Sequence, residues 1–318
     1  MASDSKVKIF GHQIDNVNED LSFRTRLSKD FTCPGIKIQR KTDSKLIKVE
    51  NNLDYYAILC NDGELRVYKN TPESSSHLLD TIHNVLDFSM NDYHFFCIAD
   101  GKLKSWNGSQ FTVFNQNEVS DLRFKQVSCG IDFSLVLTDD GKIYSIGYGL
   151  HGQLGHGDLD DSEEFQLIED LEPVKITQIN TGAWHALALS SDGDVYSWGW
   201  NQFGQVGLPS KSLADKRCSS RTKDPDELTN VQLTPFPLDG IEEVSIVSCG
   251  SRHSALLTKT GHLYTFGWNG FGQLGRKPSY LSLSDPINSA CDNIECVDGT
   301  FSDLFCSHWL TKVCFMQS

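Results

Sequence analysis

The sequence predicts an all-β fold, a closed β-propeller in which six four-stranded blades can be counted and a seventh, too degenerate to see, is left open. Three observations support this prediction: a strand-turn-strand unit recurs along the chain, no long helical pattern competes with it, and one copy is divided between the two chain ends. Repeats of about 40–50 residues built from hairpins are typical of propellers, whose closure removes exposed sheet edges. We treat residues 1–318 as one domain with an inserted loop at residues 208–244.

The best-preserved copies of the unit occupy the middle and later parts of the chain. Each copy has a strand-like run, a turn that ends in glycine, a second strand-like run and a closing Gly-Gln-Leu/Val-Gly. Valine, isoleucine, threonine and aromatic residues favour strands, and Asp-Gly or Thr-Gly between two such runs indicates a tight hairpin. The first halves are "VSCGIDFSLVLTDDG" (127–141), "INTGAWHALALSSDG" (179–193) and "VSCGSRHSALLTKTG" (247–261), and the second halves are "GKIYSIGYGLHGQLG" (141–155), "GDVYSWGWNQFGQVG" (193–207) and "GHLYTFGWNGFGQLG" (261–275).

Two weaker copies come before these three. "YYAILCNDGELRVYKN" (55–70) and "YHFFCIADGKLKSWNG" (93–108) keep the two strands and the turn but lack the Gly-Gln-Leu-Gly end. The turn glycines of successive copies are spaced most widely between Gly193 and Gly261, so this interval contains the insertion.

One further copy is divided between the chain ends. "IECVDGTFSDLFCSHWL" (294–310) begins a unit whose closing segment is missing, and "VKIFGH" (7–12) is similar to "LYTFGW" (263–268). We therefore expect the first strand of the chain to complete the last blade.

The stretch "IYSIGYGLHG" (143–152) raises an alternative, because Gly-x-Gly-x-x-Gly after a strand is the pattern of a dinucleotide-binding turn. Such a turn requires a helix after it, and here the acidic "DLDDSEEF" (158–165) follows. The slot of Gly149 holds Asn201 and Asn269 in the other copies. Glycine and asparagine both tolerate a left-handed backbone, so we expect this conformation at the slot and no bound cofactor.

Charge and composition exclude several classes of function. The formal net charge of −14 argues against direct binding of nucleic acid, whose phosphates the protein would repel. We expect no secretory signal, because the N-terminal "MASDSKVKIFGHQ" has no apolar h-region. We also expect no membrane span, because no apolar run approaches the required ~18 residues. The ten cysteines are scattered, and several lie in apolar runs as small hydrophobic residues. Cys291 and Cys296 form the closest pair, but no second pair at zinc-ligand spacing accompanies them, so no metal site is predicted.

The sequence contains no catalytic motif, and we expect a protein that is not an enzyme. His185 and His253 share one repeat slot and are expected to pack between blades. Trp198 and Phe266 share a second slot with the same expected role. Trp200 and Trp268 share a third slot just outside the strand, where either packing or protein binding is consistent with the pattern.

Two charged segments interrupt the repeat. The first segment is the insertion, which contains five basic residues: Lys211, Lys216, Arg217, Arg221 and Lys223. We expect them either to contact phosphate or an acidic partner, or to belong to a solvated loop. The second segment is the acidic run that follows Gly157, and we expect it either to meet a basic partner or histone tail or to be a solvated connector. Its candidate binding residues are Asp160, Asp161, Glu163 and Glu164.

The repeat unit with its Gly-Gln-Leu-Gly end resembles the regulator of chromosome condensation repeat family, strongly over residues ~125–300. The segment "GWNQFGQVGLPSKSLAD" (199–215) resembles the small members of that family, which have degenerate N-terminal repeats and an insertion at this place. The resemblance implies a propeller, usually of seven blades. It also implies a nuclear, chromosome-associated adaptor, found also in the cytoplasm, that docks a Jumonji-C oxygenase acting on histones or arginyl residues.

Two other functions within the family stay open. One is guanine-nucleotide exchange on a small GTPase, and the other is a cytosolic adaptor role in the modification of tRNA or a translation factor.

Overall fold

The structure of the protein, a computed structural model, describes residues 7–11, 24–26, 46–69, 77–115, 119–208, 230–275, 290–297, 299–307 and 310–315. Strands make up most of these residues, and they are accompanied by one short 3-10 helix, η1 (Glu169–Leu171). No helix within the described ranges is long and apolar enough to cross a bilayer.

The strands form six sheets, which we call blades one to six in chain order. Blade one contains β2 (Arg24–Arg26), β3 (Leu46–Asn51), β4 (Tyr55–Cys60), β5 (Leu65–Lys69) and β6 (His77–Ile82). Blade two contains β7 (Val85–Met90), β8 (Phe95–Ala99), β9 (Lys102–Trp106) and β10 (Phe111–Val113). Blade three contains β11 (Phe124–Cys129), β12 (Phe133–Thr138), β13 (Ile143–Gly147) and β14 (Ser162–Leu167).

The later blades follow the same order. Blade four contains β15 (Ile176–Thr181), β16 (His185–Ser190), β17 (Val195–Trp200) and β18 (Val231–Pro237), so the predicted insertion at residues 208–244 includes the fourth strand of this blade. Blade five contains β19 (Val244–Cys249), β20 (His253–Thr258), β21 (Leu263–Trp268) and β22 (Ala290–Val297). Blade six contains β23 (Phe301–Ser307), β24 (Leu310–Phe315) and β1 (Val7–Gly11).

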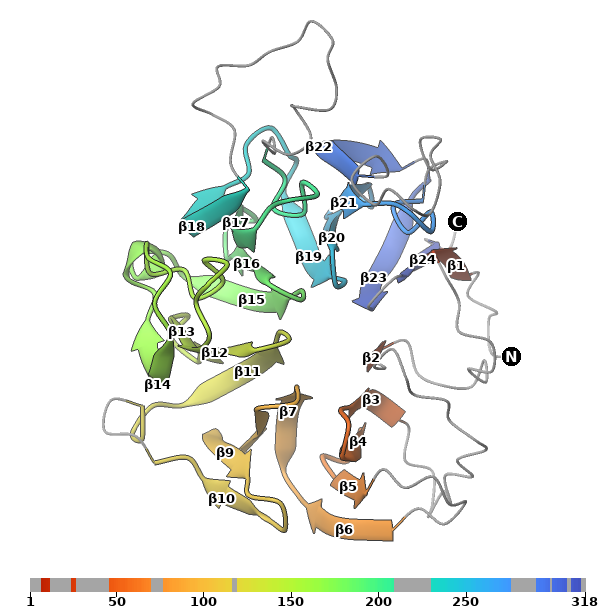
Figure 1. Ribbon diagram of the computed structural model, residues 1–318. Helices are drawn as coiled ribbons and strands as arrows, with labels where there is room; N and C mark the ends of the chain where they lie inside the picture. Colours follow the sequence, from red (N-terminus) through yellow and green to blue (C-terminus); the bar gives the residue numbers. More distant parts are fainter. Residues whose placement is uncertain are drawn as a thin grey trace, which may run out of the picture.

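The six blades surround a common centre (Figure 1). Strands β7, β11, β15, β19 and β23 are the innermost strands of their blades, and β10, β14 and β18 lie at the outside. Each innermost strand contacts a strand of the next blade, as β7 does with β11 and β15 with β19. The all-β prediction is therefore confirmed, and blades two to five are four-stranded and antiparallel as expected. Among the described residues blade one has five strands, because the parallel strand β2 is added to it, and blade six has three.

The two ends of the chain meet in blade six. Strand β1 pairs antiparallel with β24, which places Val7 opposite Cys314 and Gly11 opposite Leu310. This pairing confirms that the first strand completes the last copy of the unit. Strand β2, which the repeat pattern did not predict, pairs in parallel with β3 and contacts β23, so it lies between blades six and one.

Side chains of one innermost strand bind the backbone of the next one. An innermost strand has no neighbouring strand on the side of the axis, so its backbone groups there need other partners. The Gln126 amide accepts a hydrogen bond from Ile179 N and donates one to Ile179 O, both at 2.9 Å. Gln178 makes the same pair of bonds with Val247, at 3.1 and 3.0 Å. Shorter side chains make similar bonds. Asn180 Oδ1 accepts from Cys249 N at the same junction as Gln178, while Ser89 Oγ accepts from Cys129 N and Ser248 Oγ accepts from Cys306 N at two other junctions.

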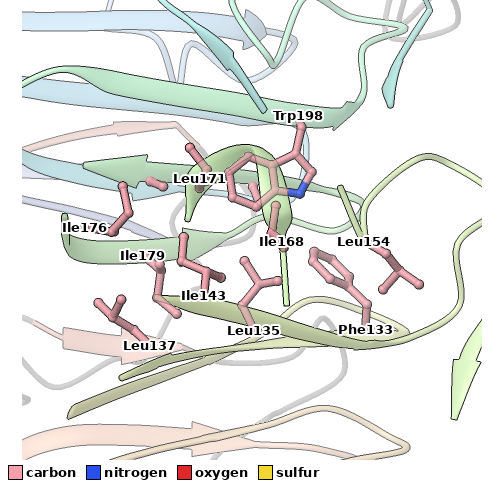
Figure 2. Close-up of a cluster of buried hydrophobic side chains, with 12 residues drawn as sticks. Phe133, Leu135, Leu137, Ile143, Leu154, Ile168, Leu171, Ile176, Ile179 and Trp198 are labelled. Atoms are coloured by element: carbon pink, nitrogen blue, oxygen red, sulfur yellow. The ribbon is translucent and has the colours of Figure 1, made fainter. Parts of the chain in front are cut away.

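Apolar side chains fill the space between adjacent blades, as Figure 2 shows for blades three and four. Phe133 and Leu135 on β12 face Ile176 and Ile179 on β15 across this space. Trp198 from β17 closes the cluster, is fully buried, and donates its indole N–H to Gln153 O at 2.9 Å. The predicted packing role of the Trp198 and Phe266 slot is confirmed, because Phe266 is also fully buried.

The expectation of a left-handed backbone at the Gly149 slot was wrong. Among the described residues other than glycine, only Asn84 and Asp100 have a positive φ. Asn201 Oδ1 instead accepts a hydrogen bond from Val206 N at 3.2 Å, so its amide supports the loop that follows. Gly149 is required for space, because a Cβ there would lie 2.0 Å from Asp160 O.

The pairing of β1 with β24 predicts a specific crosslink. Because Val7 lies opposite Cys314, Val7→Cys is expected to form a disulfide with Cys314 under mild oxidation, since facing residues on antiparallel strands are within reach of such a bond. Peptide mapping by mass spectrometry measures it, and Val7→Cys combined with Cys314→Ser is the control. A product in which the introduced cysteine is joined only to cysteines other than Cys314 would contradict the pairing.

The hydrogen bonds between blades predict a stability change. Gln126→Ala removes both bonds to Ile179 and is expected to lower the free energy of unfolding by about 1–3 kcal/mol, the usual effect of leaving inward-facing backbone groups without a partner. Denaturant unfolding measures this, with Gln166→Ala on the exposed surface of β14 as the matched control. Equal effects of the two substitutions on the free energy of unfolding would show that the bonds between Gln126 and Ile179 do not stabilise the fold.

Candidate functional site

Two sets of connections gather at one end of the blades. Neighbouring strands run antiparallel, so the first and third strands of a blade end on the same side. The turns after the first strands and the longer connections after the third strands therefore share this side, which we call the loop face. In the described chain it includes residues 52–54, 91–94, 130–132 and 148–161, together with 182–184, 201–208 and 250–252.

A hollow of about 120 Å³ opens among the turns of the loop face. Residues at the ends of β3, β7, β11, β15 and β19 line it, including Asn52, Asn91 and Ile131. Main-chain bonds connect the turns around it, because Ile131 N donates to Ala183 O at 3.0 Å and Ala183 N donates to Ser251 O at 3.1 Å. The rim is therefore fixed by the backbone of successive blades.

Beside this rim lies a group that we call the aromatic cluster: His151, Trp184, Trp200, Phe203 and Arg252. Trp184 and Trp200 meet edge to face with ring centres 5.3 Å apart, and His151 lies 5.2 Å from the Trp184 ring. The guanidinium of Arg252 lies 5.2 Å from the Phe203 ring and 5.7 Å from the Trp200 ring. Because these residues come from blades three, four and five, the cluster exists only in the folded ring.

Polar residues hold the aromatic cluster in position. Asp132 accepts hydrogen bonds from Trp184 Nε1 at 2.9 Å and from Gln153 Nε2 at 3.2 Å. Gln153 in turn accepts from the backbone N–H of His151 at 2.8 Å. Burial lowers the pKa of Arg252 below its ordinary value, yet a guanidinium stays charged in proteins. The cluster therefore presents three half-buried rings, His151, Trp184 and Trp200, and one cation over the buried Phe203 ring.

The structure places the two predicted tryptophans differently. Trp200 is half-buried at the centre of the aromatic cluster. Trp268 is only 8 % exposed and packs edge to face against Phe271 within blade five. Binding by either residue stays a prediction, and the burial of Trp268 favours its packing role.

The predicted acidic residues occupy two locations. Asp160 and Asp161 belong to the loop face, where Asp161 Oδ1 accepts a hydrogen bond from Gly149 N at 2.8 Å. Glu163 and Glu164 lie on the outer strand β14 with exposed side chains. The five predicted basic residues lie outside the described residues; they are Lys211, Lys216, Arg217, Arg221 and Lys223.

The histidine slot joins successive blades, as expected. His185 Nε2 lies 3.0 Å from Ser254 Oγ, and His253 Nε2 lies 3.0 Å from Thr311 Oγ1. Both rings are fully buried. In blade two His94 makes the equivalent contact to Ser134, and burial lowers its pKa to about 4. A packing role for this slot is thus confirmed, and among the described residues no group of His, Cys, Asp and Glu side chains is placed to hold a metal.

Sequence reasoning missed Trp184 and Arg252 as members of the site. Together with Asp132 they occupy one slot, two residues after the glycine that ends each first strand. The flanking positions of the repeat are nearly constant, whereas this slot holds an acid, an aromatic ring and a base in turn. Variation of chemistry at one slot of a constant repeat was the signal that could have identified these candidate residues.

Comparison with known proteins identifies the repeats. Models of the regulator of chromosome condensation (RCC1) repeat match residues 124–153, 176–205 and 244–273, and a second model of this repeat matches 140–189 and 192–257. The protein called RCC1 domain-containing protein 1 is 38 % identical in Mus musculus, over 54 % of this chain and 51 % of that protein. In Homo sapiens it is 37 % identical, over 52 % of this chain and 50 % of that protein. The chain thus spans about half the length of these curated relatives.

Solved structures agree on the fold. The crystal structure of Prp20p from Saccharomyces cerevisiae, described with its binding properties to Gsp1p and histones, superimposes with a TM-score of 0.65 at 20 % identity, covering 86 % of this chain and 70 % of that one. Yeast RCC1 (Prp20) bound by Kap60 gives a TM-score of 0.63 at 18 % identity, covering 87 % and 67 %. Residues 124–273 therefore contain RCC1 repeats, and the chain has a propeller-type all-β fold.

Proposed function

We propose that this protein is a non-enzymatic adaptor that docks a partner protein through the aromatic cluster of its loop face. The observation that supports this is that Trp184 and Trp200 of blade four and Arg252 of blade five lie in contact with one another. Tryptophan and arginine are enriched among the few residues that carry most of the binding energy of protein interfaces. Because Asp132 already orients Trp184, little freedom is lost on binding.

The scaffold of this adaptor is, in our proposal, a closed ring of six blades. Pairing of β1 with β24 completes blade six, and β2 bridges from β3 to β23. A closed ring has no free sheet edge, which keeps the turns of the loop face at fixed distances from one another.

The partner in this proposal is a Jumonji-C oxygenase that acts on histones or arginyl residues, and the complex works on chromosomes in the nucleus. The RCC1 repeats and the likeness to RCC1 domain-containing protein 1 support this choice. The experiment below distinguishes this function from two alternatives. One is guanine-nucleotide exchange on a small GTPase, and the other is an adaptor role in tRNA or translation-factor modification.

A substitution in the aromatic cluster tests the docking site. Arg252→Ala is expected to reduce capture of a Jumonji-C protein from nuclear extract by about thirtyfold, because a central interface residue contributes about 2 kcal/mol or more. Quantitative mass spectrometry of the captured proteins measures this. Arg123→Ala is the matched control, since Arg123 is exposed and pairs with Asp139 at the turn between β12 and β13, away from the loop face.

The identity of the captured protein decides between the functions. Recovery of a small GTPase alone, with faster nucleotide release in vitro, would replace the adaptor by an exchange factor. Unchanged capture by the Arg252→Ala protein would move the interface away from the aromatic cluster.

We also propose that the basic segment of the insertion contacts an acidic surface of the partner. Its five positive charges stand out in a chain of net charge −14, which is the observation that supports this. Replacing Lys211, Lys216, Arg217, Arg221 and Lys223 together by glutamine is expected to weaken partner capture about threefold to tenfold and to flatten its salt dependence. A deletion of residues 211–223 is the second variant, and equal capture by all three proteins would contradict the contact.

A further inference from the structure

A second group of side chains is exposed on the loop face, on blades one to three. Five large apolar residues, which we call the apolar patch, extend into solvent there: Leu53, Tyr93, Tyr148, Leu150 and Leu159. Leu53 and Leu150 are each 68 % exposed. Single exposed apolar residues are ordinary, but a connected group of them marks an interaction surface.

Contacts between the loops make the apolar patch one surface. The turn that carries Leu53 is bound to the turn that carries Tyr93, because Leu53 N donates to Asp92 Oδ1 at 3.4 Å and Asn52 Nδ2 donates to Asn91 O at 2.9 Å. The rings of Tyr93 and Tyr148 meet edge to face with centres 5.5 Å apart. These contacts therefore hold the turns of blades one, two and three that carry the patch next to one another.

The connection between β13 and β14 extends the patch. Gly149, which separates Tyr148 from Leu150, packs against the backbone of Leu159 and Asp160, so that both sides of the loop lie together. The hydrogen bond from Gly149 N to Asp161 Oδ1 fixes this arrangement. A surface whose loops are already fixed binds without a large cost in ordering.

The charged residues beside the apolar patch have one sign. Asp54, Asp92, Asp158 and Asp160 are exposed in the segments that carry the patch. Residues 52–54, 91–94 and 148–161 contain no lysine or arginine. Burial lowers the pKa of His94 to about 4 and also lowers that of His156, so these two histidines add little positive charge near neutral pH. The patch thus lies in a negative potential that attracts a basic partner.

We propose that the apolar patch binds a basic segment of a partner polypeptide, with apolar side chains against Tyr93 and Leu150 and with lysine or arginine beside Asp92 and Asp160. This site goes beyond the proposed docking function, because the aromatic cluster belongs to blades three to five and carries a cation of its own. Charge complementarity and exposed apolar area together select a segment that is both basic and apolar. An acidic or purely hydrophilic segment lacks one of the two contributions.

Fluorescence anisotropy tests the proposal on the full chain. The probe is a short labelled peptide in which lysine and leucine alternate. Asp92→Asn combined with Asp160→Asn is expected to weaken its binding about threefold to tenfold, since two exposed charge pairs are lost. Leu150→Ser is expected to weaken it to a similar degree through lost apolar contact.

Matched controls lie away from the loop face. Asp140→Asn combined with Asp192→Asn removes the same charge from the hairpin turns between β12 and β13 and between β16 and β17. Leu86→Ser makes the same change at a residue that is 61 % exposed near the start of β7. Both control proteins are expected to bind the peptide as the unaltered protein does.

Three outcomes would overturn the proposal. Equal weakening of peptide binding by the control variants would show that the net charge of the protein alone explains the binding. Equal affinity for a peptide in which lysine and serine alternate would show that apolar contacts do not contribute to the binding. Loss of peptide binding in Arg252→Ala would assign the peptide to the aromatic cluster, which leaves the proposed function standing and rejects the separate site.

Discussion

Hydrogen bonds from side chains of one innermost strand to the backbone of the next are the interaction on which this structure depends, and they are seen at successive junctions from β7 to β23. The innermost strand of a blade has one edge toward the central axis, where its backbone groups have no strand partner. In this chain glutamine, serine and asparagine side chains bind those groups, as Gln126 does with Ile179. The bonds fix the spacing and the tilt of adjacent blades. The buried apolar clusters between blades can then pack without gaps, as around Trp198.

The loop face follows from this arrangement of the blades. Its turns take their positions from strands that cannot shift independently, so residues from different repeats come together at fixed distances. Trp184 and Arg252 occupy the same repeat slot and yet meet at Trp200, because the loops of blades four and five converge there. A repeat protein can thus keep its packing residues constant and change the chemistry of one face by varying one half-buried slot.

The loop face is also asymmetric around the ring. Blades one to three present apolar residues with carboxylates, whereas blades three to five present aromatic rings with a half-buried arginine. This division gives two chemically different surfaces on one rigid scaffold. The likeness to Prp20p at 20 % identity indicates that this fold tolerates wide sequence change.

The sequence alone determined the all-β class, the blade unit and the joining of the two chain ends, because hairpin turns, strand residues and the glycines of the repeat are local signals. It also determined the packing role of His185 and Trp198, since a residue that recurs at one slot faces the same neighbour in each blade. Only the tertiary structure decided that Gly149 is required by the nearby Asp160 backbone and that Asn201 acts through its side chain. It alone brought His151, Trp184 and Arg252 together, because contacts between residues of different blades depend on the angle between blades, which no local pattern encodes.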